Sequence, residues 1–276
     1  MSNITAADVK RLRDQTGAGM MDVKKALVEA EGDAEKAIEI LRKKGQKLSL
    51  KRAGREAKEG VVIAKVSEDQ KRGIVIRLSC ETDFVAKNED FIAFADGIAT
   101  VALENMPASK EELGALELNG KSIQDEVVNQ VGVIGEKIEL ADYESLEAET
   151  VVPYIHMGYR AGVIVGLNQD GPDVVEAGKN VAMQIAAMRP LALDKDAVDE
   201  SIIEKEIEIG KEQARQEGKP EQILEKIARG KLSKFFQENT LLEQSYVKDN
   251  KLSVSEYLHS IDKDLTVTAF EHLMLG

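Results

Sequence analysis

Residues 73–87 read Gly-Ile-Val-Ile-Arg-Leu-Ser-Cys-Glu-Thr-Asp-Phe-Val-Ala-Lys. From Ile74 to Cys80 the side chains alternate with the two-residue period of a half-buried strand. The polar residues 81–83 end the strand, and Phe84 then places an apolar ring in a polar turn. The ring either folds back as a lid on its own core or reaches outward to be buried by another molecule. Burial of such a ring is worth roughly 1.5–3 kcal/mol, and taken alone these residues favour the lid.

This strand belongs to a pattern of two strands and a helix that occurs twice in the chain. Helix residues of the two copies align at a constant offset of 83 positions, so that Pro107 corresponds to Pro190. Each copy also has a late strand, at 137–141 and at 265–270. The pattern predicts an α+β fold in which each half is a small antiparallel sheet with a helix across it. The expected strands and helices are 60–66, 73–80 and 89–104 in the first half, and 150–156, 161–168 and 173–188 in the second.

The two halves differ at the junction that carries Phe84. In the second half the corresponding junction, residues 168–172, reads Asn-Gln-Asp-Gly-Pro, which is an ordinary polar turn. If the fold required a lid, both halves should have one. The lid and the outward-reaching ring therefore both remain open as interpretations of Phe84.

The first 45 residues form a separate module of three short helices. Thr5 and Asp8 predict a capping box at the first helix, and the third helix is expected to end at Gly45. Met20 and Met21 are adjacent at the start of the second helix, so at least one of them should be exposed. The expected helices are 5–13, 20–30 and 34–44.

The charge of the chain is unevenly distributed. The net charge is −13, yet residues 42–58 contain eight basic residues and only one acidic residue, Glu56. A mostly acidic chain disfavours extended nucleic-acid binding by its main body. We interpret residues 46–59 as a basic linker between domains, and the alternative is an RNA-associated adaptor that uses residues 42–58. The basic stretch has no interleaved aromatic residues, which favours the linker.

Beyond the linker we expect a core N-subdomain, 60–145, and a core C-subdomain, 146–276. The second contains an insertion, 197–238, in which apolar residues recur at helical spacing on both sides of Gly218-Lys219-Pro220. This pattern predicts an antiparallel helical hairpin, which can serve as an arm for a partner.

The residues give little support to catalysis. His156, His259 and His272 lie outside any Cys or carboxylate pattern of metal-ligand type. Cys80 with His156 could be a nucleophile and its base, but a thiol at the end of an apolar strand favours a buried, inert cysteine. The single cysteine, the lack of a secretory start and the shortness of the apolar runs predict a soluble cytoplasmic protein. The sequence thus indicates a binding protein and not an enzyme.

Two long motifs, residues 12–27 and residues 78–87, resemble the signatures of the bacterial elongation factor Ts family, the guanine nucleotide exchange factors for elongation factor Tu. The likeness covers nearly the whole chain. It implies a ubiquitin-associated-like three-helix module, two related subdomains and a helical hairpin. No metal and no cofactor are expected. In some relatives the hairpin mediates self-association, so a homodimer through the hairpin is possible, and the oligomeric state stays open.

The resemblance also implies which residues bind the partner. Thr82, Asp83, Phe84 and Val85 would enter the G domain of elongation factor Tu, where the Phe84 ring wedges between helices and displaces the magnesium and phosphate site. Met20, Met21 and Lys24 would grip another helix of the G domain. His156 would contact a different domain of the GTPase.

Overall fold

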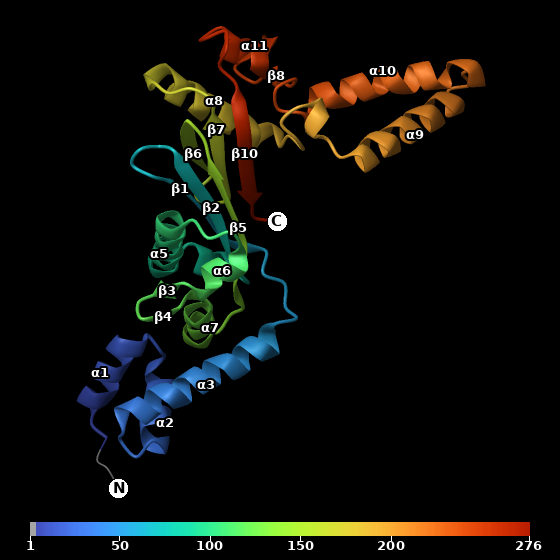
Figure 1. The fold of residues 1–276 in the computed structure, drawn as a ribbon. Coiled ribbons are helices and arrows are strands. Elements are labelled where there is room, and N and C mark those ends of the chain that lie inside the picture. Colours follow the sequence, from blue (N-terminus) through green and yellow to red (C-terminus); the bar gives the residue numbers. More distant parts are fainter. Residues whose placement is uncertain (1–3) are drawn as a thin grey trace. The chain divides into compact units, whose positions relative to one another are not determined.

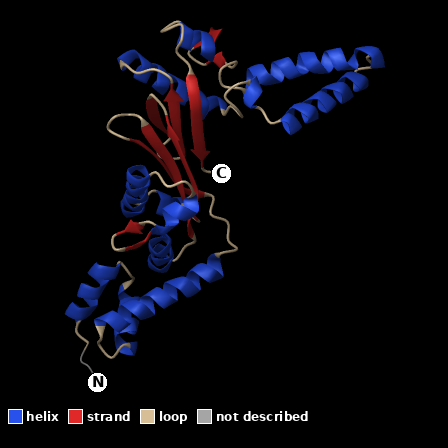
Figure 2. Cartoon of the chain, viewed as in Figure 1, coloured by secondary structure: helices blue, strands red, loops and turns tan. Residues whose placement is uncertain are grey.

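The computed structural model describes residues 4–276; residues 1–3, which belong to the expected amino-terminal module, lie outside the described residues. Helices and antiparallel strands are both abundant, which confirms the α+β class (Figure 2). The chain divides into two compact units, which are described separately. The first unit contains the chain up to Ile63 with Ile76–Glu144 and Leu273–Gly276, and the second contains Ala64–Val75 and Ser145–His272.

Three helices form the amino-terminal part of the first unit (Figure 1). Thr5 caps the first helix with the expected capping box, in which its hydroxyl accepts a hydrogen bond from the backbone N–H of Asp8. Apolar residues of all three helices, among them Leu12, Leu27 and Ala37, form a small buried core. The helices are α1 (Ala6–Thr16), α2 (Met20–Glu29) and α3 (Ala34–Arg52).

The prediction that Gly45 ends the third helix is wrong, because α3 continues to Arg52. Gly45 is buried inside α3 at the place where this helix packs against α7 (Ile123–Ile134). A Cβ atom added at Gly132 of α7 would lie 2.9 Å from the Cα atom of Gly45. The two glycines therefore permit a close crossing of two helix backbones, and Gly45 is a packing residue instead of a helix end.

The first repeat contains the expected strands and helix, with further short elements around them. Its sheet has the strand order β1-β2-β5, so the second strand is central. Ile76 and Leu78 of β2 and Ile98 of α5 are fully buried. The elements of this repeat are β1 (Glu59–Val66), β2 (Arg72–Cys80), α4 (Asp83–Ala86), α5 (Glu89–Asn105), α6 (Lys110–Ala115), β3 (Glu117–Leu118), β4 (Lys121–Ser122), α7 and β5 (Ile138–Glu147).

The second repeat has the same plan. Its sheet has the order β10-β7-β6, again with the second strand in the centre. β6 and β7 pair antiparallel from Thr150 opposite Leu167 to His156 opposite Ala161. Side chains of α8 pack on this sheet, and all seven residues of β7 are buried. The elements are β6 (Thr150–His156), β7 (Ala161–Leu167), α8 (Pro172–Met188) and β10 (Val267–Met274).

The repeat is confirmed at both ends of its helices. α5 and α8 begin and end at positions that differ by the offset of 83 found in the sequence. Each helix is closed by a residue in the left-handed conformation, Met106 with φ 44° and Arg189 with φ 49°, and a proline follows each of them. Since a proline cannot extend the helix and left-handed backbone closes it, both copies terminate by the same device.

The predicted helical hairpin is present as α9 (Glu200–Gln216) and α10 (Glu221–Asn239), which pack against each other in Figure 1. Gly210 and Ala228 face each other at their contact, where a Cβ atom on Gly210 would lie 3.1 Å from the Cα atom of Ala228. Within residues 4–276 no helix combines the length and apolar character needed to cross a membrane. The remaining elements are η1 (Lys195–Ala197), β8 (Ser245–Tyr246), β9 (Asp249–Ser253) and α11 (Val254–His259).

Candidate functional site

Phe84 lies on α4, a helix of one turn between β2 and α5. Its side chain is 83% exposed, so the interpretation of the ring as a lid on its own core is wrong. No residue of α4 is buried. The ring is therefore an apolar group that the fold leaves in solvent.

Thr82 begins α4 as its N-cap. Its hydroxyl oxygen accepts a hydrogen bond from the backbone N–H of Val85 at 3.4 Å. In the first turn, the carboxylate of Asp83 pairs with the ammonium of Lys87 at 2.6 Å, and this hydrogen bond lowers the pKa of Asp83. The four predicted residues 82–85 thus lie together in one short, capped turn.

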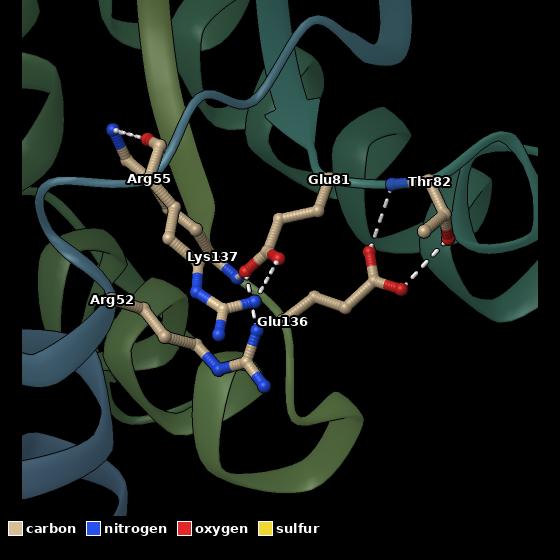
Figure 3. Close-up of polar contacts among 6 residues, drawn as sticks. All are labelled: Arg52, Arg55, Glu81, Thr82, Glu136 and Lys137. Carbon is tan, nitrogen blue, oxygen red and sulfur yellow. Dashed lines mark hydrogen bonds and ion pairs between the residues drawn. The ribbon is translucent and has the colours of Figure 1, made fainter.

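Glu136, two residues before β5, holds the start of this turn (Figure 3). One carboxylate oxygen accepts the backbone N–H of Thr82 at 3.0 Å, and the other accepts the hydroxyl of Thr82 at 2.7 Å. Both hydrogen bonds go to a charged acceptor, a class stronger than neutral hydrogen bonds. The N-cap residue of α4 is therefore fixed through its main chain and its side chain together.

Glu81 connects the same turn to the basic segment. Its carboxylate accepts the backbone N–H of Lys137 at 2.6 Å and pairs with Arg52 at 2.5 Å and Arg55 at 3.0 Å (Figure 3). Its side chain is only 15% exposed. Burial acts to raise the pKa of Glu81, but the hydrogen bond from Lys137 and the two arginines outweigh it and lower the pKa to about 2.

The predicted residues of α2 form an exposed face of their own. Met20 is 58% and Met21 is 62% exposed, and Lys24 is exposed one turn further on. Val28, which the sequence reading missed, extends this face with 58% exposure, and it lies seven residues after Met21 as helical spacing requires. The opposite face of α2 is buried through Val23, Ala26 and Leu27.

His156 belongs to the second unit, at the end of β6, whereas the other predicted site residues belong to the first unit. Its Nδ1 atom lies 3.0 Å from the hydroxyl oxygen of Tyr154. The turn that follows presents Met157, which is 73% exposed and has a φ of 51°. His156 thus stands beside an exposed apolar residue that the sequence reading did not single out.

The basic residues of segment 42–58 largely face carboxylates of the same chain. Within residues 4–276, six of the eight make ion pairs at 3.0 Å or less. Cations that are paired in this way attract phosphates less than free ones. The first half of the predicted linker, residues 46–52, belongs to α3. The pairs are Arg42–Asp125, Lys43–Glu39, Lys44–Asp22, Arg52–Glu81, Arg55–Glu81 and Lys58–Glu56.

Cys80 is fully buried, as the strand pattern predicted. Its thiol donates a hydrogen bond to the carbonyl oxygen of Thr82 at 3.2 Å. Burial, with a smaller effect of the Glu136 charge, raises the pKa of Cys80 to about 12, so the thiol stays protonated at neutral pH. A protonated and buried thiol is a poor nucleophile. Within residues 4–276 no group of three or more His, Cys, Asp or Glu side chains could hold a metal ion.

The sequence reading missed Glu81, Glu136, Arg52 and Arg55 as residues of the site. The excess of positive charge before residue 59 is a signal for nearby carboxylates, but it does not show which carboxylates pair with it. Glu136 lies 54 residues from Thr82 in the chain, and only the fold brings the two together.

Comparisons with known proteins all lead to one family, through a family model for residues 81–276 and through relatives that cover nearly the whole chain. The family model described as "Elongation factor TS" matches residues 81–276. The elongation factor Ts of Christiangramia forsetii is 54% identical over 276 residues, which are 100% of both chains. That of Amoebophilus asiaticus is 53% identical over 99% of each chain. That of Porphyromonas gingivalis is 44% identical over 99% of this chain and 98% of the relative.

Proposed function

The chain belongs to the elongation factor Ts family, and on that basis we propose that it is the guanine nucleotide exchange factor for elongation factor Tu. It binds the GDP-bound GTPase in the cytoplasm and promotes the release of GDP, which supports translation elongation. It makes and breaks no covalent bond, so it is not an enzyme in the chemical sense, and it uses no cofactor.

The observation that carries this proposal is the exposed ring of Phe84 on a turn whose start is tightly held. Asp83 and Phe84 enter the G domain, where the ring wedges into an apolar pocket and disrupts the magnesium and phosphate site. An exposed ring of this size gains up to about 3 kcal/mol on burial. If the pocket opens only in the nucleotide-free arrangement, this gain corresponds to roughly a hundredfold weakening of GDP binding.

Nucleotide and factor then favour two different arrangements of one site. Each must weaken the binding of the other by the same coupling free energy, because the linkage between two ligands is reciprocal. The factor therefore leaves when a new nucleotide binds, and the cycle needs no input of chemical energy from the factor itself.

Two further surfaces support the contact. Met20, Met21 and Lys24 on the exposed face of α2 bind another helix of the G domain through apolar burial and charge. His156, together with the turn after β6, contacts a different domain of the GTPase.

The test is the rate at which labelled GDP leaves purified elongation factor Tu. Phe84→Ala should lower the acceleration by about a hundredfold, because it removes the ring whose burial drives the exchange. Leu50→Ala is the matched control, because Leu50 is also a large apolar residue of the first unit and is 80% exposed, but it lies on α3 outside the proposed site.

The possible outcomes test the exchange function and the Phe84 wedge separately. If the unaltered protein does not accelerate GDP release, the exchange function is wrong. If it does, but Phe84→Ala accelerates release equally well, the wedge is wrong while exchange stands. An equal loss in Leu50→Ala would show that exposed apolar area in general, and not the position of Phe84, is what matters.

A further inference from the structure

The carboxylates of Glu81 and Glu136 form a pair of crossed hydrogen bonds, in which each accepts the backbone N–H of the residue that follows the other. Glu81 accepts the backbone N–H of Lys137 at 2.6 Å, and Glu136 accepts the backbone N–H of Thr82 at 3.0 Å (Figure 3). Each acidic residue therefore holds the main chain of the residue that follows the other. We call these four residues, Glu81, Thr82, Glu136 and Lys137, the reciprocal clasp.

Arginines balance the negative charge of the clasp. Arg52, at the end of α3, pairs with Glu81 and is itself only 22% exposed, and Arg55 pairs with the second oxygen of the same carboxylate. Lys137 also donates from its ammonium to the carbonyl oxygen of Arg55 at 3.3 Å. The clasp thus joins the end of the amino-terminal helices, the start of α4 and the start of β5.

Buried side chains do not fix the start of α4. The helix has four residues, and none of them is buried. A single turn without buried side chains is not stable by itself, because most helical stability in proteins comes from packing. The direction in which Phe84 points therefore depends on the residue at which the turn begins, and the clasp holds that residue, Thr82, by its backbone and its hydroxyl.

We propose that Glu81 and Glu136 are positioning residues, which hold α4 so that Phe84 points outward, and that Arg52 and Arg55 tie the amino-terminal helices to this position. This inference rests on the proposed exchange function. The clasp residues need not touch the partner for this role.

Glu136→Ala removes both acceptors of Thr82 and is expected to lower the rate of GDP release by about tenfold at limiting factor, because hydrogen bonds to charged groups are the costly ones to lose. Glu136→Gln keeps the shape and one acceptor oxygen, so it should restore most of the rate. Glu139→Ala is the control, since Glu139 lies three residues further along, on β5, and pairs with the ammonium of Lys137, at 2.9 Å, instead of with Thr82. Its rate should equal that of the unaltered protein.

The decisive measurement places Glu136→Ala in a Phe84→Ala background. If the clasp acts by positioning Phe84, the second substitution should cause no further loss, because residues that act as one unit are not additive. A loss that is equally large in both backgrounds would overturn the positioning role. Phe84→Ala alone reports separately on the wedge, so a failure of the clasp and a failure of the proposed function give different results.

Arg55→Ala is a second test of the clasp, which can be used if Glu136→Ala does not fold. Arg55 is 57% exposed, so the fold should tolerate its loss. We expect the rate of GDP release to fall about threefold, because Glu81 loses the second of its two arginine partners. Hydrogen exchange at the backbone N–H of Thr82 and Val85 should become faster in this variant. An unchanged rate of GDP release in Arg55→Ala, together with unchanged hydrogen-exchange protection of Thr82 and Val85, would overturn the proposal.

Discussion

Exposure alone does not identify Phe84 as a functional residue. Leu50 is 80% exposed and Phe84 is 83% exposed, and single exposed apolar residues are common on protein surfaces. Phe84 differs from Leu50 in its setting, because it stands on a one-turn helix whose N-cap is held by the side chain of Glu136, whereas Leu50 lies within a long helix. An exposed side chain on a specifically held backbone is the stronger indication of a binding role.

The carboxylate of Glu81 should also make the free energy of unfolding depend on pH. Its pKa is lowered from 4.5 to about 2 in the folded protein, so its contribution is fully present above about pH 4.5 and is lost as the pH falls toward 2. The contribution is on the order of 2–3 kcal/mol. Urea unfolding followed between pH 6 and pH 2.5 should show a flatter decline for Glu81→Gln than for the unaltered protein.

Glu149→Gln is the control for that measurement, because Glu149 pairs with Lys71 on the surface and both side chains are about half exposed. Exposed pairs contribute little to stability. Parallel curves for Glu81→Gln and the unaltered protein would contradict the role assigned to the Glu81 carboxylate.

The residues of the site were predictable to different degrees. The motif and the internal repeat singled out residues 82–85, because the second half of the chain has an ordinary turn at the matching place. The partners of Thr82 and Glu81 were not predictable, because Glu136 and Arg52 approach them only through long-range packing, and any of the many carboxylates and cations of the chain could have served.

Among the elements, those with strong periodicity and clear stops were predicted well. α5 and α8 have both, and each ends before a proline. α4 was missed because four residues are too few to show a period, and α7 was missed together with its packing on α3. The predicted end of α3 was wrong because a glycine often marks the end of a helix in a sequence, whereas Gly45 lies inside α3 and packs against another helix.

The crossing of α3 and α7 predicts a specific cost. Gly132→Ala would place a Cβ atom 2.9 Å from the Cα atom of Gly45, and because backbone cannot yield as a side chain can, the helices must move apart. We expect a loss of about 1–3 kcal/mol in the free energy of unfolding, measured with urea.

Gly230→Ala is the matched control for this element. Gly230 also lies inside a helix, α10, but a Cβ atom there would meet nothing within 4 Å. Helix propensity alone should make this variant more stable by about 0.5–1 kcal/mol. If both substitutions change the free energy of unfolding equally, the close crossing of α3 and α7 does not require a glycine at position 132.

In the molecule as a whole, the positive segment 42–58 is balanced internally within a chain of net charge −13. We therefore expect GDP release to change by no more than a few fold between 50 and 200 mM salt, because the main driving group in the proposed mechanism is an apolar ring. A function that depended on binding an RNA backbone through six or more contacts would lose roughly a thousandfold or more in affinity over the same range. Exchange assays and RNA filter binding at the two salt concentrations would distinguish these cases.

The arrangement of the chain into a repeat was the most reliable whole-molecule prediction. It followed from an offset that recurs in apolar positions and in prolines, and the same strand order in both sheets agrees with it. The association of the amino-terminal helices and α7 in one compact unit was not visible in sequence, because the two helices approach most closely at two glycines, which carry no hydrophobic signal.

The two hydrogen bonds from Thr82 to Glu136 have a consequence for how affinity is obtained. A loop that becomes ordered only on binding loses conformational entropy at that moment, about 1–2 kcal/mol for each residue fixed. Here the turn that carries Phe84 is already ordered when the chain folds, so this loss belongs to folding and does not weaken the complex. A free peptide with the sequence of residues 81–88 would have the same ring and the same charges, yet it would bear that entropy itself and bind far more weakly than the folded protein.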